Sequence, residues 1–159
     1  MLGPDCSGSQ GYSRKTRHSR DAETKGMRFL AKYMKKEFHV WLEKARSDIS
    51  TAEYLFKGNK FEEAGFFCQQ SVEKSLKALL IFRTGELLKS HDLPWLAQKA
   101  GIPREMHDRC KDLTMMYVAF RYPDVPAIDD VEERVGEFMG FAKRIWTWVK
   151  RKISESEKS

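Results

Sequence analysis

The cluster Arg121-Tyr122-Pro123-Asp124 is the part of the sequence best suited to hold an anion. An arginine can donate two parallel hydrogen bonds to a phosphate, and a tyrosine ring offers a face on which a nucleobase can stack. Pro123 fixes the turn that carries these side chains. A structural alternative stays open, in which Arg121 neutralises a helix C-terminus and pairs with Asp124 while Tyr122 packs against a neighbouring helix.

Two lysines and a histidine add further candidates. Lys74 and Lys77 are neighbours on a helical surface, where two ammonium groups could neutralise a phosphate, or they could be solvated and paired with Glu73 or with another helix. His91 could bind a nucleotide or exchange a proton, or it could belong to a capping network at the start of a helix. The sequence thus predicts one set of residues that binds a nucleotide or RNA phosphate: Lys74, Lys77, His91, Arg121, Tyr122 and Asp124.

The cysteines do not form a recognisable metal or redox motif. Cys6, Cys68 and Cys110 show neither a C-x-x-C pair nor the spacing of metal ligands, so we expect no metal, no cofactor and a reducing, cytoplasmic compartment. We assign no catalytic residue. No run of about 18 apolar residues and no signal peptide is found, so we expect neither membrane insertion nor export.

Length and composition indicate one folded domain of weakly basic charge. The chain has 159 residues, of which 41% are hydrophobic, and its 29 basic and 23 acidic residues give a net charge of +6. This balance favours anionic partners without requiring one. Residues 1–26 are rich in glycine, serine and charge and are predicted to be a disordered basic tail, whereas residues 27–159 are predicted to form a helical bundle.

The segment between Asn59 and Gly85 has the strongest helical periodicity. Its apolar residues recur at steps of four and three, which places them on one face of a long helix that ends at Gly85. A preceding helix is expected over residues 38–57, with a backward extension. Because only Gly58-Asn59 separates the two, they should form an antiparallel pair.

A short helix and a third long helix are expected next. Ser90 or Asp92 can cap the short helix, which should end at Gly101. Pro103 fits the first turn of the third long helix, and Pro123 disfavours helical geometry in the residue before it, which ends that helix.

The last helix is expected over about residues 130–153, with Asp129 or Asp130 as its cap. Acidic residues at its start and basic residues at its end should both complement the helix dipole. Trp146 and Trp148 cannot share one helical face, so one of them should point outward and mark an interface. Together the elements predict an all-α up-and-down bundle of four long helices plus one short helix.

Four blocks of sequence carry a family resemblance. They are W-L-E-K-A-R-S-D-I-S-T-A-E-Y-L, F-E-E-A-G-F-F-C-Q-Q-S-V-E-K-S-L-K-A-L-L, S-H-D-L-P-W-L and F-R-Y-P-D, and in this order they resemble the signatures of the HEPN domain. The abbreviation stands for higher eukaryotes and prokaryotes nucleotide-binding. The resemblance covers about residues 38 to 150. It implies a homodimeric helical module that is often encoded beside a minimal nucleotidyltransferase, and some relatives are metal-independent ribonucleases of toxin-antitoxin systems.

The ribonuclease motif of those relatives is absent from the sequence. In the motif an arginine is followed, after four to six residues, by a histidine, and none of His18, His39, His91 and His107 has an arginine at that distance. We therefore predict a non-catalytic or weakly catalytic module that binds a nucleotide or RNA and works as a homodimer beside a nucleotidyltransferase, as in a toxin-antitoxin pair. Two alternatives remain: a metal-independent endoribonuclease toxin with a cryptic site of Arg121 and His91, and a non-catalytic structural adaptor.

Overall fold

The structure is a computed structural model that describes residues 17–159, without the side chains of residues 17–20, 30–32 and 34–36. The chain divides into two units, Met1–Lys32 and Tyr33–Ser159. Helix α1 (Arg17–Lys57) begins in the first unit and continues into the second. The predicted disordered tail lies partly outside the described residues, and its residues 17–26 are helical. The domain boundary between residues 26 and 27 stays a prediction.

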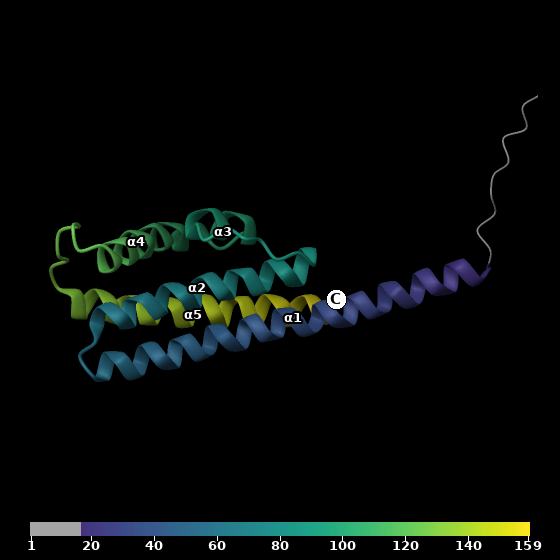
Figure 1. The fold of residues 1–159 in the computed structure, drawn as a ribbon, viewed down its shortest axis with the longest axis horizontal. Coiled ribbons are helices and arrows are strands. Elements are labelled where there is room, and N and C mark those ends of the chain that lie inside the picture. The colour runs from purple at the N-terminus through teal and green to yellow at the C-terminus, as the bar shows by residue number, and fades with distance from the viewer. Residues whose placement is uncertain (1–16) are drawn as a thin grey trace, which may run out of the picture. The chain divides into compact units, whose positions relative to one another are not determined.

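Five α-helices account for the described fold, and no strand occurs in residues 17–159. The prediction of an all-α bundle with four long helices and one short helix is confirmed. The helices are α1 (Arg17–Lys57), α2 (Phe61–Thr84), α3 (Leu93–Ala100), α4 (Arg104–Arg121) and α5 (Val131–Glu157), as labelled in Figure 1.

The predicted ends of α2 and α3 are confirmed by local backbone geometry. Gly85 and Gly101 adopt φ angles of 74° and 64°, which a glycine reaches without steric cost, and each follows the last residue of a helix. Asp92, rather than Ser90, caps α3, because its carboxylate accepts a hydrogen bond of 3.0 Å from the Trp95 amide. The loop between α2 and α3 is thereby held at both ends.

Helix α5 is longer than its sequence pattern indicates. It continues to Glu157, and its last turn contains no basic residue. The expectation that basic residues there complement the helix dipole is wrong, because the dipole acts mainly within the last turn. Asp130 precedes the helix, as expected, but its side chain makes no capping hydrogen bond.

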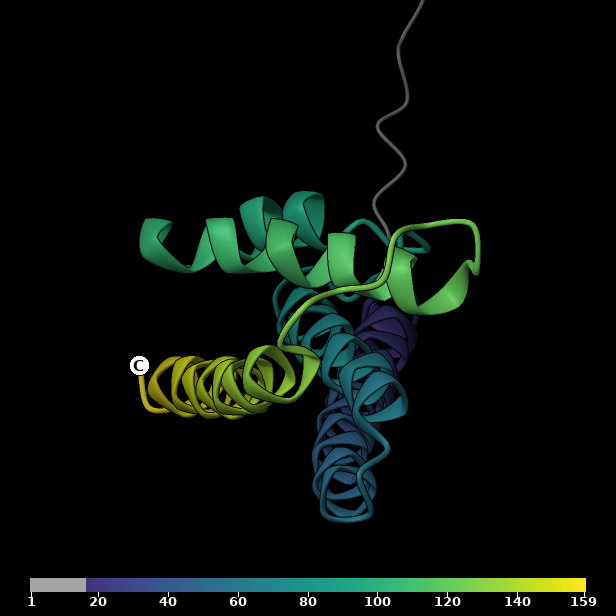
Figure 2. The same cartoon turned by 90° about the vertical axis from the view of Figure 1, so that its left-hand side faces the viewer.

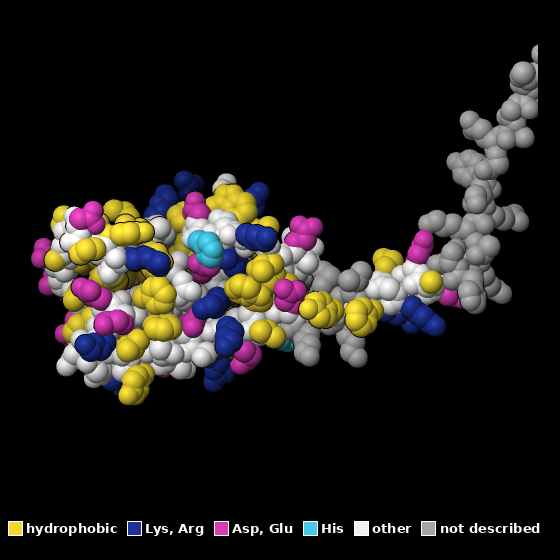
Figure 3. Space-filling view, viewed as in Figure 1, with side chains coloured by type: hydrophobic (Ala, Val, Ile, Leu, Met, Phe, Trp, Pro, Cys, Tyr) yellow, Lys and Arg dark blue, Asp and Glu magenta, His cyan; other side chains and the backbone are white. Residues whose placement is uncertain are grey.

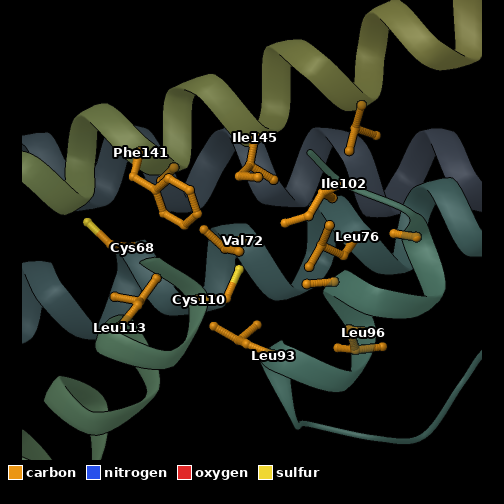
Figure 4. Close-up of a cluster of buried hydrophobic side chains, with 14 of the residues drawn as sticks. Cys68, Val72, Leu76, Leu93, Leu96, Ile102, Cys110, Leu113, Phe141 and Ile145 are labelled. Atoms are coloured by element: carbon orange, nitrogen blue, oxygen red, sulfur yellow. The ribbon is translucent and has the colours of Figure 1, made fainter. Parts of the chain in front are cut away.

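Helix α2 lies at the centre of the unit that begins at Tyr33. Figures 1 and 2 show α3 and α4 on one side of α2 and α5 and α1 on others. Figure 4 shows the apolar core that these helices share. Its labelled side chains come from α2 (Cys68, Val72, Leu76), α3 (Leu93, Leu96), α4 (Cys110, Leu113), α5 (Phe141, Ile145) and, between α3 and α4, Ile102.

Neither tryptophan of the pair in α5 points outward. Trp148 is buried, with 8% of its surface exposed, and Trp146 is half-buried and donates from Nε1 to the carbonyl oxygen of Leu42 at 3.0 Å. The predicted outward tryptophan is therefore wrong. Since α5 packs against both α1 and α2, its buried arc is wide enough to include both indole rings.

Candidate functional site

A buried carboxylate, Glu73 on α2, is the centre of a polar network. Its side chain is 5% exposed, and one oxygen, Oε1, lies 2.9 Å from Nζ of Lys77 and 2.8 Å from Nδ1 of His91. The other oxygen accepts a hydrogen bond of 3.2 Å from the Gln69 amide. Three polar partners thus surround the carboxylate, which is the arrangement that a buried charge requires.

The network continues along α2 towards α1. Gln70 donates to Gln69 at 2.8 Å, and Lys74 donates to Gln70 at 3.4 Å and to Asp48 of α1 at 2.5 Å. The Ser71 hydroxyl donates to a backbone carbonyl of α1 at 2.8 Å. These contacts add polar links to the apolar packing between the two helices.

The ammonium groups of Lys74 and Lys77 are both engaged with carboxylates. Lys77 is not a solvated lysine, because its side chain is 4% exposed and lies over the Trp41 ring, with Nζ 5.6 Å from the ring centroid. Lys74 is more accessible, with 23% of its side chain exposed, and pairs with Asp48. A phosphate at either lysine would have to replace a protein carboxylate.

His91 differs from the lysines because it faces solvent. Its side chain is 79% exposed, yet Nδ1 is held by Glu73. A histidine held at one nitrogen by a carboxylate has its ring orientation fixed, and the second nitrogen can exchange a hydrogen bond or a proton with a ligand. The capping role expected as an alternative belongs to Asp92.

Arg121 lies at a second place, a hollow between α2 and α4 of about 350 Å³. We call it the α2–α4 hollow. Its guanidinium lies over the Tyr117 ring at 5.7 Å and donates to the Tyr117 hydroxyl, and the Phe66 ring stacks on Tyr117 with centroids 5.7 Å apart. Figure 3 shows hydrophobic side chains, interspersed with charged ones, over the region where α2 and α4 lie side by side. The lining residues are Glu62, Glu63, Phe66, Phe67, Tyr117, Phe120 and Arg121.

The structure places the predicted site residues in two groups. Lys74, Lys77 and His91 belong to the network around Glu73, whereas Arg121 faces the first turns of α2. Glu63 and Lys77 are about 20 Å apart along the helix, given a rise of 1.5 Å per residue. Tyr122 and Asp124 are exposed and do not line the α2–α4 hollow.

Sequence reasoning missed the aromatic lining of this hollow. The helical spacing of Tyr117 and Phe120 indicates the core-facing stripe of α4, but both residues are half-buried. The useful signal is the pair Phe66-Phe67, since adjacent residues of a helix point in different directions and two large rings in succession widen the apolar face.

The described cysteines are buried thiols with no sign of reactivity. Burial raises the pKa of Cys68 and of Cys110 from 9.0 to about 12, so both stay protonated at neutral pH. Within residues 17–159 no group of three histidine, cysteine or acidic side chains is placed to hold a metal ion. No helix among the described residues is long and apolar enough to cross a membrane.

The central helix covered by four others defines a helical bundle domain, and comparisons with known proteins identify its family. The sequence model of the HEPN domain matches residues 38–152. The chain belongs to the HEPN domain family.

Two solved structures are similar to the chain. One is the crystal structure of ST0689, an archaeal HEPN homologue, which has 30% sequence identity to this chain and a TM-score of 0.62. The match covers 73% of this chain and 97% of that one. The other is the crystal structure of TT1696 from Thermus thermophilus, which has 25% sequence identity to this chain and a TM-score of 0.65. The match covers 72% of this chain and 97% of that one. A comparison with curated proteins gave no match.

Proposed function

We propose that this HEPN domain is a binding module that holds a nucleotide, free or within RNA, in the α2–α4 hollow. The observation that carries the proposal is the guanidinium of Arg121 beside a set of aromatic rings in a hollow of about 350 Å³. That volume lies within the range of small-molecule sites. Aromatic rings stack on nucleobases, and an arginine can donate two parallel hydrogen bonds to two oxygens of one phosphate.

The charges of the α2–α4 hollow favour a ligand with few phosphates. Arg121 makes no ion pair with any described acidic residue, so its charge is available to a phosphate. Glu62 and Glu63 lie on the opposite wall and would repel further phosphates, but they can accept hydrogen bonds from ribose hydroxyls or base amino groups. A nucleoside monophosphate should therefore bind more tightly than a triphosphate.

Calorimetry with AMP and UMP tests this function. Arg121→Ala should weaken binding by about 1.5 to 3 kcal/mol, the range for hydrogen bonds to charged groups. Arg104→Ala removes an exposed arginine from the other end of α4 and should leave binding unchanged. Equal affinities in the parent and in Arg121→Ala, with the helical circular dichroism intact, would refute the assignment.

The same geometry favours binding over RNA cleavage. A ribonuclease needs a general base and a cation that reach one phosphate. His91 is exposed, but its neighbouring cation Lys77 is buried and paired, and Arg121 belongs to the other group. Purified protein should leave single-stranded RNA intact without metal, and cleavage that disappears in His91→Ala would support the endoribonuclease alternative.

Homodimer formation is part of the proposal and is supported by an apolar stripe on α4. Met115 and Val118 lie three residues apart on α4, and Tyr122 is the first residue after the helix; they are 72%, 40% and 51% exposed. Exposed apolar residues on one face often mark an interface.

The minimal nucleotidyltransferase partner and a toxin-antitoxin role depend on the family alone, and the structural adaptor remains the alternative if no nucleotide binds. Co-purification with the product of a neighbouring gene tests the partner.

A further inference from the structure

A second hollow, of about 340 Å³, lies on α5 where it meets the first turn of α4. We call it the α5 hollow. No carboxylate lines it, and it shares no residue with the α2–α4 hollow. The lining residues are Met106, Lys143, Arg144, Thr147, Trp148 and Arg151.

The three cations of the α5 hollow are weakly neutralised by the protein. Arg144 is exposed and makes no ion pair with any residue that the structure describes. Lys143 lies 2.5 Å from Glu53, and Arg151 lies 3.7 Å from Glu155, but every side chain of these two pairs is more than a third exposed. Exposed pairs of this kind contribute about 0 to 1 kcal/mol, so an incoming anion can compete for the cations.

The helix dipole does not account for these cations. Lys143, Arg144 and Arg151 all precede the last turn of α5, which ends at Glu157. A positive charge is stabilised by the dipole mainly within that last turn. The dipole therefore does not explain their accumulation around one hollow, and two exposed ion pairs neutralise them only weakly.

The spacing of the cations fits a chain of phosphates. Arg144, Thr147 and Arg151 recur at steps of three and four, so they share one face of α5 and span about 10 Å. That length is more than a single phosphate covers. We propose that the α5 hollow binds the phosphodiester backbone of a single-stranded nucleic acid and neutralises at least two of its phosphates.

The lining also distinguishes a nucleic acid from an acidic protein segment. Met106 is half-buried and contributes apolar surface beside the cations, which suits the sugars and bases that accompany phosphates in a single strand. The net charge of +6 favours the approach of a long polyanion. This inference goes beyond the nucleotide site, because it needs none of the residues of the α2–α4 hollow.

Fluorescence anisotropy with labelled oligouridylate RNA and the whole chain tests the inference. Arg144→Ala and Arg151→Ala should each weaken binding about two- to fivefold, as expected for exposed ion pairs. Each should also lower the slope of log Kd against the logarithm of the salt concentration by about 0.7. That is the contribution to the slope of one neutralised phosphate in a single strand. Arg134→Ala is the matched control, because Arg134 is exposed on α5 and lines neither hollow.

Each outcome either supports or overturns the proposal. Equal affinities and slopes for Arg144→Ala and Arg134→Ala would overturn it, as would competition by polyglutamate or inorganic phosphate that equals competition by RNA at the same total charge. Affinity for AMP should be unchanged in Arg144→Ala, so this proposal and the nucleotide site can fail separately. Circular dichroism confirms that each variant is folded.

Discussion

Lys77 and Glu73 illustrate how burial changes the meaning of a charged residue. Their spacing of four indicates an ion pair on one helical face, which the sequence allows as an alternative to phosphate binding. The sequence does not predict that the pair is buried, because the cover comes from Trp41 on α1 and from His91 in the loop after α2. Lys77 therefore acts in the structure chiefly as the partner of a buried carboxylate.

We expect the energies of Glu73 and Lys77 to be coupled. Lys77→Met and Glu73→Gln should each destabilise the protein by about 3 kcal/mol, since each leaves a buried charge without its main partner. The double variant should cost clearly less than the sum. Urea unfolding of the four proteins measures the coupling, with Lys74→Met as a comparison at a more exposed pair. Strictly additive costs would contradict a buried ion pair.

The thiols of Cys68 and Cys110 should be protected by folding. Their pKa values are raised from 9.0 to about 12 by burial, so the stability they contribute is present below pH 9 and is lost as the pH rises towards 12. Native protein at pH 8 should resist alkylation at both positions, and protein in urea should react. Peptide mass spectrometry after iodoacetamide treatment measures the labelling. Fast labelling of either thiol in the native protein would contradict this burial.

At the scale of elements, two glycines distinguish close packing from open surface. A Cβ at Gly65 of α2 would lie 2.5 Å from a ring carbon of Phe120 and 3.3 Å from the Val135 side chain, whereas a Cβ at Gly140 of α5 would have no neighbour within 4 Å. Gly65 thus lets α4 and α5 approach α2, and it places Phe120 in the wall of the α2–α4 hollow.

Alanine at the two glycines should have opposite effects. Gly65→Ala should destabilise the protein by about 1 to 3 kcal/mol and weaken nucleotide binding, because the Phe120 ring has to move. Gly140→Ala should stabilise it by about 0.5 to 1 kcal/mol through helix propensity alone. Thermal unfolding and calorimetry with AMP measure both effects. A neutral Gly65→Ala would show that Phe120 moves away without cost.

The helices themselves were largely predictable, because their signals are local. Gly85, Gly101 and Asp92 mark helix ends through their own backbone or side chain, and the structure uses all three. The errors concern relations between elements. The outward tryptophan in α5 was wrong because the number of helices that contact α5 cannot be deduced from its own periodicity.

At the scale of the whole molecule, the candidate site was only partly predictable, because it depends on which helices lie side by side. Arg121 was predicted from its chemistry, and its partner Tyr117 lies one turn earlier on the same helix. Phe66, which stacks on Tyr117, comes from α2, and the two helices meet only in the folded chain. The length of α2 also explains why the single predicted set of phosphate-binding residues lies in two separate groups. Glu73, the partner of His91, and the part of the α2–α4 hollow that faces Arg121 lie at well-separated positions on this helix.

Assembly is the remaining prediction at this scale. Val118→Lys should convert a homodimer into a monomer while leaving helical content unchanged, because a charge would enter the apolar stripe of α4. Tyr54→Lys is the control, since Tyr54 is 80% exposed on α1 and lies outside the stripe. Multi-angle light scattering at micromolar concentration measures the masses. A monomeric parent would exclude this dimer, and a dimeric Val118→Lys would place the interface elsewhere.

The most direct test of the central claim is a two-dimensional NMR titration of the labelled protein with UMP. If the α2–α4 hollow holds the nucleotide, the aromatic signals of Phe66, Tyr117 and Phe120 and the guanidinium signal of Arg121 should shift with a common dissociation constant. Signals of Lys77 and His91 should stay in place, because they belong to the network around Glu73. Shifts confined to that network, or no shifts at all, would contradict the claim.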